Sequence, residues 1–338
     1  MTTLVRRLHT TRVIYGLRGQ FNAGPGAVVL AVLCLSGALA LAAPGFGSID
    51  NAAVLSRDFS ITALYGFAQM VVLASGGMNL SVGAIGGLTA VTVGGLMDSY
   101  GVPTPIAIGA GLALGATLGA VNGFLIARSG LPPFIITLAT SSIFVGINLG
   151  LTESEPYYGL PSDFMSIGTA DLFGVPVLLI VTLAAAFLLW ALFSWTGLGR
   201  QILAVGSRAG AAQLAGISML RSLITVHALS GFLSALAGVL LAARLGSSQP
   251  TIGVDWLLPS FAAPILGGVL LAGGNVSVVG CLFGAILLSV LSNGLVFLNV
   301  DPYLTTLLVG LVILGAAGAD RLRMISIETS LITARRRR

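Results

Sequence analysis

The sequence predicts an all-α polytopic bundle of about ten transmembrane helices, with both chain termini in the cytoplasm. Three observations support this fold class. The 338 residues are 56% hydrophobic and only 8% charged, whereas an ordinary soluble domain carries about a quarter charged residues. Several uncharged stretches reach the roughly 20 apolar residues that span a bilayer. Nearly all the arginines fall on one side of the predicted membrane.

Two of the uncharged stretches are too long for one helix and divide where glycine, serine and asparagine cluster. These turn-forming clusters are residues 75–79 and 272–275. Residues 1–25 form a cytoplasmic N-terminal segment, 26–319 the transmembrane domain and 320–338 a basic cytoplasmic tail. The predicted spans are 26–43, 53–75, 80–97, 104–127, 133–151, 174–194, 222–243, 256–272, 276–298 and 303–319.

The charges orient the bundle. All 16 basic residues are arginine, and all except Arg57 and Arg244 fall on the cytoplasmic side when the N-terminus is placed inside. Of the 11 acids, all except Asp320 and Glu328 fall on the other side. The first span also resembles a cleavable signal peptide, with a candidate site near residues 38–43. Whether this span is retained therefore stays open.

The composition argues against catalysis by this chain. It contains no lysine for a phosphate-binding loop and only two histidines, too few for a metal site, and no nucleophile or paired intramembrane carboxylate stands out. We therefore predict no metal and no cofactor in this chain. Arg335–Arg338 follow a membrane span, so we interpret them as a retention signal that contacts membrane lipid and predict no nucleic-acid binding.

One span carries a packing signal. Glycines recur every fourth residue at Gly111, Gly115, Gly119 and Gly123. This interval places them on one helix face, where a neighbouring backbone can approach closely.

The cytoplasmic loop 195–221 is the candidate docking segment. Ser207 is placed to cap a short helix over 208–215, with Gly216 as its left-handed stop. The small or apolar residues on its predicted exposed face suit a groove in a partner protein, and a helix lying on the bilayer is the alternative. The residues expected to shape or form the contact are Gly206, Ser207, Ala211, Ala212, Leu214 and Gly216.

The same loop carries the pattern Leu198-Gly199-Arg200, then Ala204-Val205-Gly206, then Ala211-Ala212-Gln213-Leu214-Ala215-Gly216-Ile217. In this pattern the chain resembles the permease subunits of ribose-, xylose- and galactose-type bacterial ABC importers. Further segments agree in order and spacing at 75–83, 133–138, 266–274 and 293–295, which extends the resemblance over most of residues 50–320. Family members usually carry an aspartate at the position of Asn79, an asparagine at Arg208 and a basic residue at Asn275.

The resemblance implies an inner-membrane permease that passes a monosaccharide. Its implied partners are a second permease subunit, a cytoplasmic ATPase that binds ATP and Mg²⁺, and an extracytoplasmic sugar-binding protein. The departures from the pattern leave a homodimer and a heterodimer equally open. Alternative substrates are nucleosides, a furanosyl signalling molecule or branched-chain amino acids. An autonomous secondary transporter is the rival class, although the spans lack the buried acids it would use.

The two breaks in the apolar stretches are the candidate translocation pathway. Irregular backbone at membrane depth persists only when it is buried in protein or faces water. A neutral sugar would be passed by sparse amide and hydroxyl contacts, for which Asn79, Ser81, Asn275 and Ser277 are the candidates. The alternative is that these side chains only cap the helices that follow.

Overall fold

The computed structural model describes residues 25–301 and part of 304–318. The predictions for the N-terminal segment and the basic tail lie outside the described residues, and most of the predicted span 303–319 does too. The described part is helical, with one hairpin formed by β1 (Asp171–Leu172) and β2 (Val175–Pro176).

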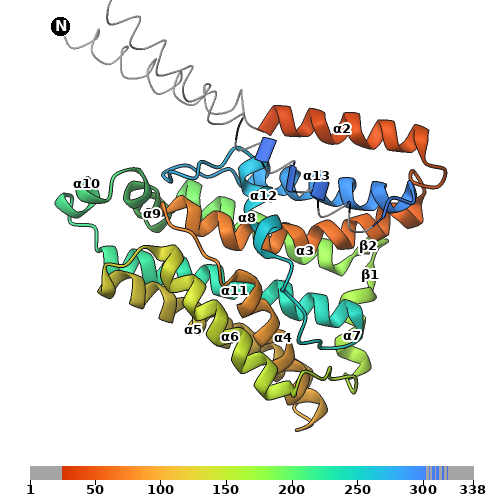
Figure 1. Cartoon of the computed structure of the whole chain (residues 1–338), viewed down its shortest axis with the longest axis horizontal. Helices are drawn as coiled ribbons and strands as arrows, with labels where there is room; N and C mark the ends of the chain where they lie inside the picture. Colours follow the sequence, from red (N-terminus) through yellow and green to blue (C-terminus); the bar gives the residue numbers. More distant parts are fainter. Residues whose placement is uncertain are drawn as a thin grey trace, which may run out of the picture.

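The long helices form one bundle (Figure 1). Five of them are long and apolar enough to cross a membrane, and these are α5, α6, α8, α11 and α13. The long helices are α2 (Pro25–Ala42), α3 (Ile49–Ala74), α4 (Val82–Asp98), α5 (Thr104–Ser129), α6 (Pro133–Thr152), α8 (Val177–Trp195), α11 (Met219–Leu245) and α13 (Val278–Phe297). The short helices are α7 (Ser162–Thr169), α9 (Gly197–Ser207), α10 (Ala209–Leu214) and α12 (Leu257–Leu266).

Helix α3 lies in the centre of the bundle. Every residue from Ala63 to Ala74 is buried, and α3 packs against α8, α11, α12 and α13. A helix surrounded by protein does not need a uniformly apolar surface, because its neighbours can satisfy polar side chains. This explains how α3 carries Gln69 in its buried half without being one of the most apolar helices.

The predicted glycine face of α5 is confirmed: Gly115, Gly119 and Gly123 face α11, and Gly111 lies nearest to Val93 of α4. A Cβ atom at Gly119 would collide with the carbonyl oxygen of His227, and one at Gly115 would meet Ala235. A Cβ at Gly123 would lie 2.5 Å from the Leu223 carbonyl oxygen. The two backbones therefore approach closely because this face of α5 has no side chains.

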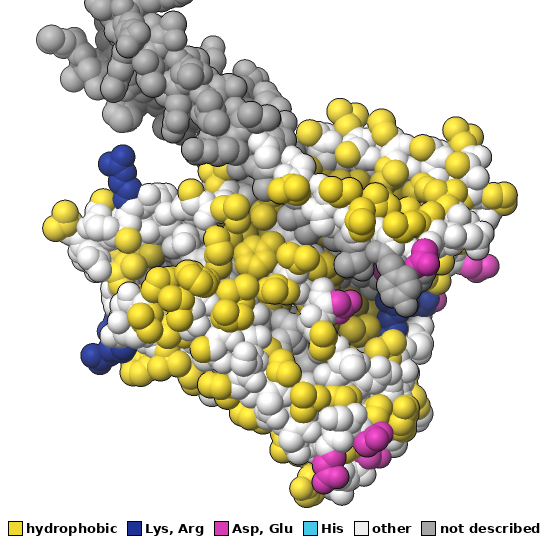
Figure 2. All heavy atoms as spheres, viewed as in Figure 1, with side chains coloured by type: hydrophobic (Ala, Val, Ile, Leu, Met, Phe, Trp, Pro, Cys, Tyr) yellow, Lys and Arg dark blue, Asp and Glu magenta, His cyan; other side chains and the backbone are white. Residues whose placement is uncertain are grey.

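The charged residues separate to opposite ends of the molecule. In Figure 2 the arginines gather over α9, α10 and the neighbouring helix ends, and the acids gather at the opposite end. Arg57 and Arg244 share the acidic end, and each is paired there: Arg57 with Asp171 and Arg244 with Asp58, both at 2.6 Å. Arg57 and Asp58 are neighbours in the sequence, but each binds a partner that is distant in the sequence.

One predicted transmembrane span does not form a helix of full length. The segment predicted to span at 256–272 forms only the ten residues of α12, about 15 Å of helix, half of a hydrocarbon core that is ~30 Å thick. Pro264 lies inside α12, which ends before Gly267 and Gly268, and Gly268 has a positive φ of 84°. Proline and two glycines oppose further helix. The other predicted spans among residues 25–301 match helices to within a few residues.

The close contact between α5 and α11 predicts a clear difference between two glycines of α5. Gly119→Ala should lower stability by about 1–3 kcal/mol, because the new methyl group overpacks against the backbone of α11. Gly109→Ala is the matched control, since a Cβ there meets nothing within 4 Å. Thermal unfolding of both purified variants in detergent measures the difference. Equal melting temperatures would contradict the packing described here.

Candidate functional site

Helix α9 fixes the loop between α8 and α11 to the bundle. Thr196 begins α9 by accepting a hydrogen bond from the Gly199 N–H at 3.1 Å. Ile202 and Val205 are buried, so α9 lies with its apolar face against the other helices. Helix α10 follows and projects from the end of the molecule (Figure 1).

The structure corrects two local predictions in this loop. Ser207 does not cap the second helix: it ends α9, and its hydroxyl donates to the Leu203 carbonyl at 2.9 Å. The burial of Ile202 and Val205 keeps the chain helical up to Ser207, and Arg208 provides the extended break before α10. Ala212 is also not exposed, because it faces the protein with 4% of its surface accessible.

Two other features of the loop agree with the sequence. Gly216 adopts a left-handed conformation with φ 80°. Around it, the Gly216 N–H donates to the Gln213 carbonyl and the Ile217 N–H to the Ala212 carbonyl, which is the paired bonding that ends a helix. Ala211 is exposed, and Leu214 is exposed to 94%. Helix α10 therefore presents a free apolar side chain at its tip.

Gly206 joins the loop to both breaks in the membrane domain. A Cβ atom at Gly206 would collide with the Ala74 carbonyl oxygen and lie 2.6 Å from the Gly274 nitrogen. The Gly274 N–H donates to the Ala74 carbonyl at 3.0 Å, so the two breaks are also bonded to one another. Gly76 and Gly273 complete the contact. We call these four glycines, 76, 206, 273 and 274, the glycine junction.

The predicted pathway residues of the first break lie inside a closed polar network. Asn79 and Ser81 are completely buried. The Asn79 amide nitrogen donates to Ser230 at 3.0 Å, and its oxygen accepts from the Ser81 hydroxyl at 2.7 Å. Asn122 donates to the same Ser81 hydroxyl at 2.8 Å. These side chains hold α4, α5 and α11 together, and their predicted role in passage stays a prediction.

The second break separates its two candidate residues. The Ser277 hydroxyl accepts from the Gly280 N–H at 3.0 Å and caps α13, which confirms the capping interpretation for this residue. Asn275 is partly exposed and follows the glycine junction directly. Asn275 therefore follows Gly274, which contacts Gly206. The hydrogen bonds of the Asn79 side chain go to Ser230 and Ser81 and not to Asn275.

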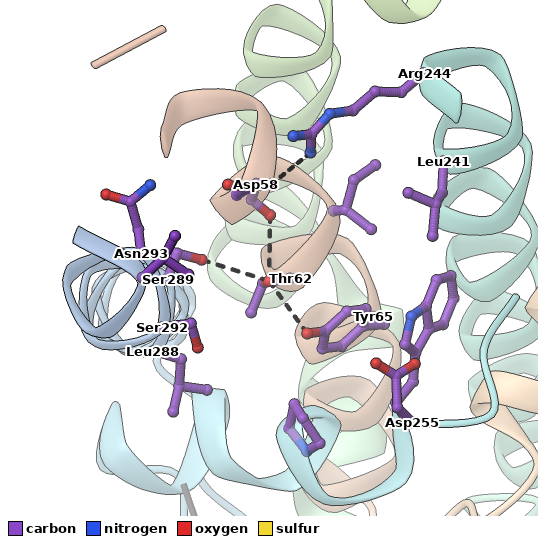
Figure 3. A pocket seen from close by; sticks show the side chains of 14 residues that line it. Asp58, Thr62, Tyr65, Leu241, Arg244, Asp255, Leu288, Ser289, Ser292 and Asn293 are labelled. Carbon is purple, nitrogen blue, oxygen red and sulfur yellow. Dashed lines mark hydrogen bonds and ion pairs between the residues drawn. The ribbon is translucent and has the colours of Figure 1, made fainter. Parts of the chain in front are cut away.

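A cavity of about 530 Å³ opens in the other half of the molecule. Figure 3 shows side chains from α3, α11, α12 and α13 around it. Such a volume suits a small-molecule ligand, since ligand pockets run from about 300 to 1,000 Å³. Its lining residues are Asp58, Ile61, Thr62, Tyr65, Leu241, Arg244, Asp255, Trp256, Pro259, Leu288, Ser289, Ser292, Asn293 and Val296.

Polar side chains, aliphatic side chains and two aromatic rings line the cavity. Thr62 accepts a hydrogen bond from the Tyr65 hydroxyl at 3.1 Å and lies 3.5 Å from the Ser289 hydroxyl (Figure 3). The rings of Tyr65 and Trp256 stack with centroids 4.9 Å apart. Both rings are buried, and a Cβ at Gly86 would lie 2.6 Å from the Trp256 ring, so glycine there leaves room for the indole.

Sequence reasoning did not identify this cavity. Tyr65 is a tyrosine within a predicted span, and Asp255 and Trp256 stand at the start of another. The signal in the sequence was the presence of these polar and aromatic residues within or at the start of predicted spans. No spacing in the sequence indicates that residues 65, 256 and 289 meet, because their contact depends on how three helices pack.

Comparison with known proteins identifies the family. The family model described as "Branched-chain amino acid transport system / permease component" matches residues 48–317. No solved structure matches the chain.

Three similar proteins have names that state a transported compound. A ribose import permease of Bacillus subtilis is 38% identical over 280 residues, 82% of this chain and 87% of its own length. A fructose import permease of Rhizobium meliloti is 35% identical, with 93% of this chain and 90% of that protein covered. An autoinducer 2 import system permease of Salmonella paratyphi B is 35% identical, with 75% and 78% covered.

The glycine junction predicts that position 206 tolerates no side chain. Gly206→Ala should lower stability by about 1–3 kcal/mol, because the methyl group pushes the loop away from the Ala74 carbonyl. In the control Gly210→Ala, a Cβ meets nothing within 4 Å, so stability should hold or rise slightly. Thermal unfolding of the purified proteins tests this. A Gly206→Ala protein as stable as the control would rule out a tight junction.

Proposed function

Because the chain belongs to the permease-component family of ATP-binding-cassette (ABC) importers, we propose that it forms the membrane passage for a monosaccharide. As a family member it is a multi-pass membrane protein and not itself an enzyme. Such a permease works with an ATPase that handles ATP and with a binding protein that delivers the substrate.

The names of the relatives support a sugar as the substrate. Import permeases for ribose and for fructose both match this chain over more than four fifths of its length. The autoinducer 2 relative keeps a furanosyl signalling molecule as an alternative. The family description names branched-chain amino acids, the second alternative. Proteins named for sugars match most of the chain, and this favours the sugar.

The glycine junction is the observation that best supports the proposal that this chain is an importer permease. An importer has to connect an ATPase surface with the passage, and Gly206 belongs to the loop and also contacts both breaks of the membrane domain. We infer that loop 195–221 is the ATPase dock. Gly206 and Gly216 shape it, buried Ala212 anchors α10, and exposed Ala211 and Leu214 form the contact.

We assign the cytoplasmic end of the passage to the second break. Asn275 is partly exposed beside the junction and Ser277 caps the following helix, so Asn275 is the better candidate for a sugar contact. Asn79 and Ser81 would then keep the helices around the passage in place. Sugar uptake at the wild-type rate by a folded Asn275→Leu variant would exclude this assignment. A second permease, identical or different, is proposed to complete the passage.

The dock predicts that an acidic residue at the tip of α10 separates the permease from its ATPase. Leu214→Glu should reduce ATPase co-purification at least about tenfold, because losing a central apolar anchor costs about 2 kcal/mol or more and tenfold corresponds to about 1.4 kcal/mol. Leu172→Glu is the control, since Leu172 is also exposed but lies in β1. Quantified pull-down of the ATPase measures the effect. Unchanged co-purification with Leu214→Glu would refute the dock.

The proposed topology has ten crossings with both termini cytoplasmic. Arg128 lies in the last turn of α5, Arg200 in α9, Arg208 between α9 and α10, and Arg221 in the first turn of α11. These positions support the topology through the positive-inside rule. The eighth crossing is made by α12 and the irregular segment 267–277 together. A reporter enzyme fused after Arg338 should therefore be active only in the cytoplasm. Activity in the periplasm would overturn the topology.

A further inference from the structure

The cavity beside α3 has polar groups that the packing of the bundle does not use. Asp255 is exposed, and neither its carboxylate nor the Ser292 hydroxyl makes a hydrogen bond or ion pair with the residues that the structure describes. Both line the cavity together with partly buried Thr62 and buried Ser289. Groups that could have paired within the protein instead face an open volume of about 530 Å³.

We propose that this cavity binds the transported sugar as one neutral, hydroxyl-rich ring during its passage. The inference rests on the proposed function and adds the place and the selectivity of binding. A carboxylate and several hydroxyls can each accept or donate one bond to a sugar hydroxyl. The stacked rings of Tyr65 and Trp256 form an apolar floor for the C–H face of the ring.

The charges of the cavity favour a neutral ligand. Arg244 is bound by Asp58 at 2.6 Å (Figure 3), so its guanidinium is already occupied by a carboxylate. Asp255 then leaves one unpaired negative charge among the ionised residues that line the cavity. A phosphorylated sugar would be repelled by that charge. An amino acid would find a partner for its ammonium group but no free cation for its carboxylate.

The cavity is connected to the glycine junction through two elements. Helix α3 contributes Asp58, Thr62 and Tyr65 to the cavity, and its last residue, Ala74, accepts the bond from Gly274. Helix α12 begins beside Trp256, and the chain after it reaches Gly274. A displacement at the ATPase dock would therefore move the wall and the floor of the cavity together.

Three substitutions distinguish an effect on sugar binding from an effect on folding. Asp255→Asn keeps the shape of the side chain and removes the charge, and Ser292→Leu fills the cavity. Glu155→Gln is the matched control, because Glu155 is an exposed acid that does not line the cavity. Each variant is purified with its ATPase, and ATP hydrolysis stimulated by the sugar-loaded binding protein checks that the complex is assembled.

The experiment begins with uptake of labelled ribose, fructose, allose and leucine by the whole transporter in liposomes. The sugar taken up best is then bound to the permease–ATPase complex without binding protein, in a scintillation proximity assay. We expect displacement by excess unlabelled sugar but not by leucine or ribose 5-phosphate. Asp255→Asn should weaken binding about tenfold, as for the loss of one charge-assisted hydrogen bond. Ser292→Leu should abolish binding, and Glu155→Gln should bind like the wild type.

The outcomes distinguish the two proposals. Uptake of no sugar, with uptake of leucine instead, would overturn the proposed function. Normal sugar uptake with no binding to the complex would overturn the cavity inference alone. Wild-type binding by Asp255→Asn, or displacement of the sugar by leucine, would also overturn it. If Ser292→Leu fails to assemble, the nearly isosteric Asp255→Asn decides the question.

Discussion

The structure depends on satisfying backbone groups that lie at membrane depth without helical partners. Lipid offers no hydrogen bonds, so each such N–H and C=O must find a partner inside the protein. The first break does this through side chains: the Leu80 N–H donates to Thr137 at 3.1 Å. The Gln69 amide lies 2.8 Å from the Asn79 carbonyl oxygen and 3.2 Å from its nitrogen, so one amide orientation satisfies both. The second break is bonded to the first through Gly274 and Ala74.

This requirement explains why so much of the bundle is built on glycine. Two irregular segments can exchange backbone hydrogen bonds only if no side chain separates them, as at Gly76, Gly273 and Gly274. The same close approach joins α5 to α11. A membrane protein gains little from excluding apolar side chains from lipid, so tight packing of backbones supplies much of its stability.

The arrangement divides the molecule into two functional regions that share α3. The arginine-rich end holds the proposed dock and the glycine junction, and the acidic end holds the cavity. Between them, the polar network of Asn79, Ser81, Asn122 and Ser230 fixes α4, α5 and α11. Helices α3 and α12 therefore connect the junction to the cavity, while the network joins the other helices to one another.

The sequence by itself determined the helices, the charge asymmetry, the glycine face of α5 and the left-handed end of α10 at Gly216. These features depend on local periodicity and on the conformations that single residues allow, which can be read along one chain. Only the tertiary structure decided the partners of Arg57 and Asp58, the burial of Ala212 and the cavity. Each of these depends on contacts between residues far apart in sequence, such as Tyr65 with Trp256 or Gly206 with Gly274. Hydropathy predicts that a residue lies in the membrane, but helix packing determines which residues it contacts there.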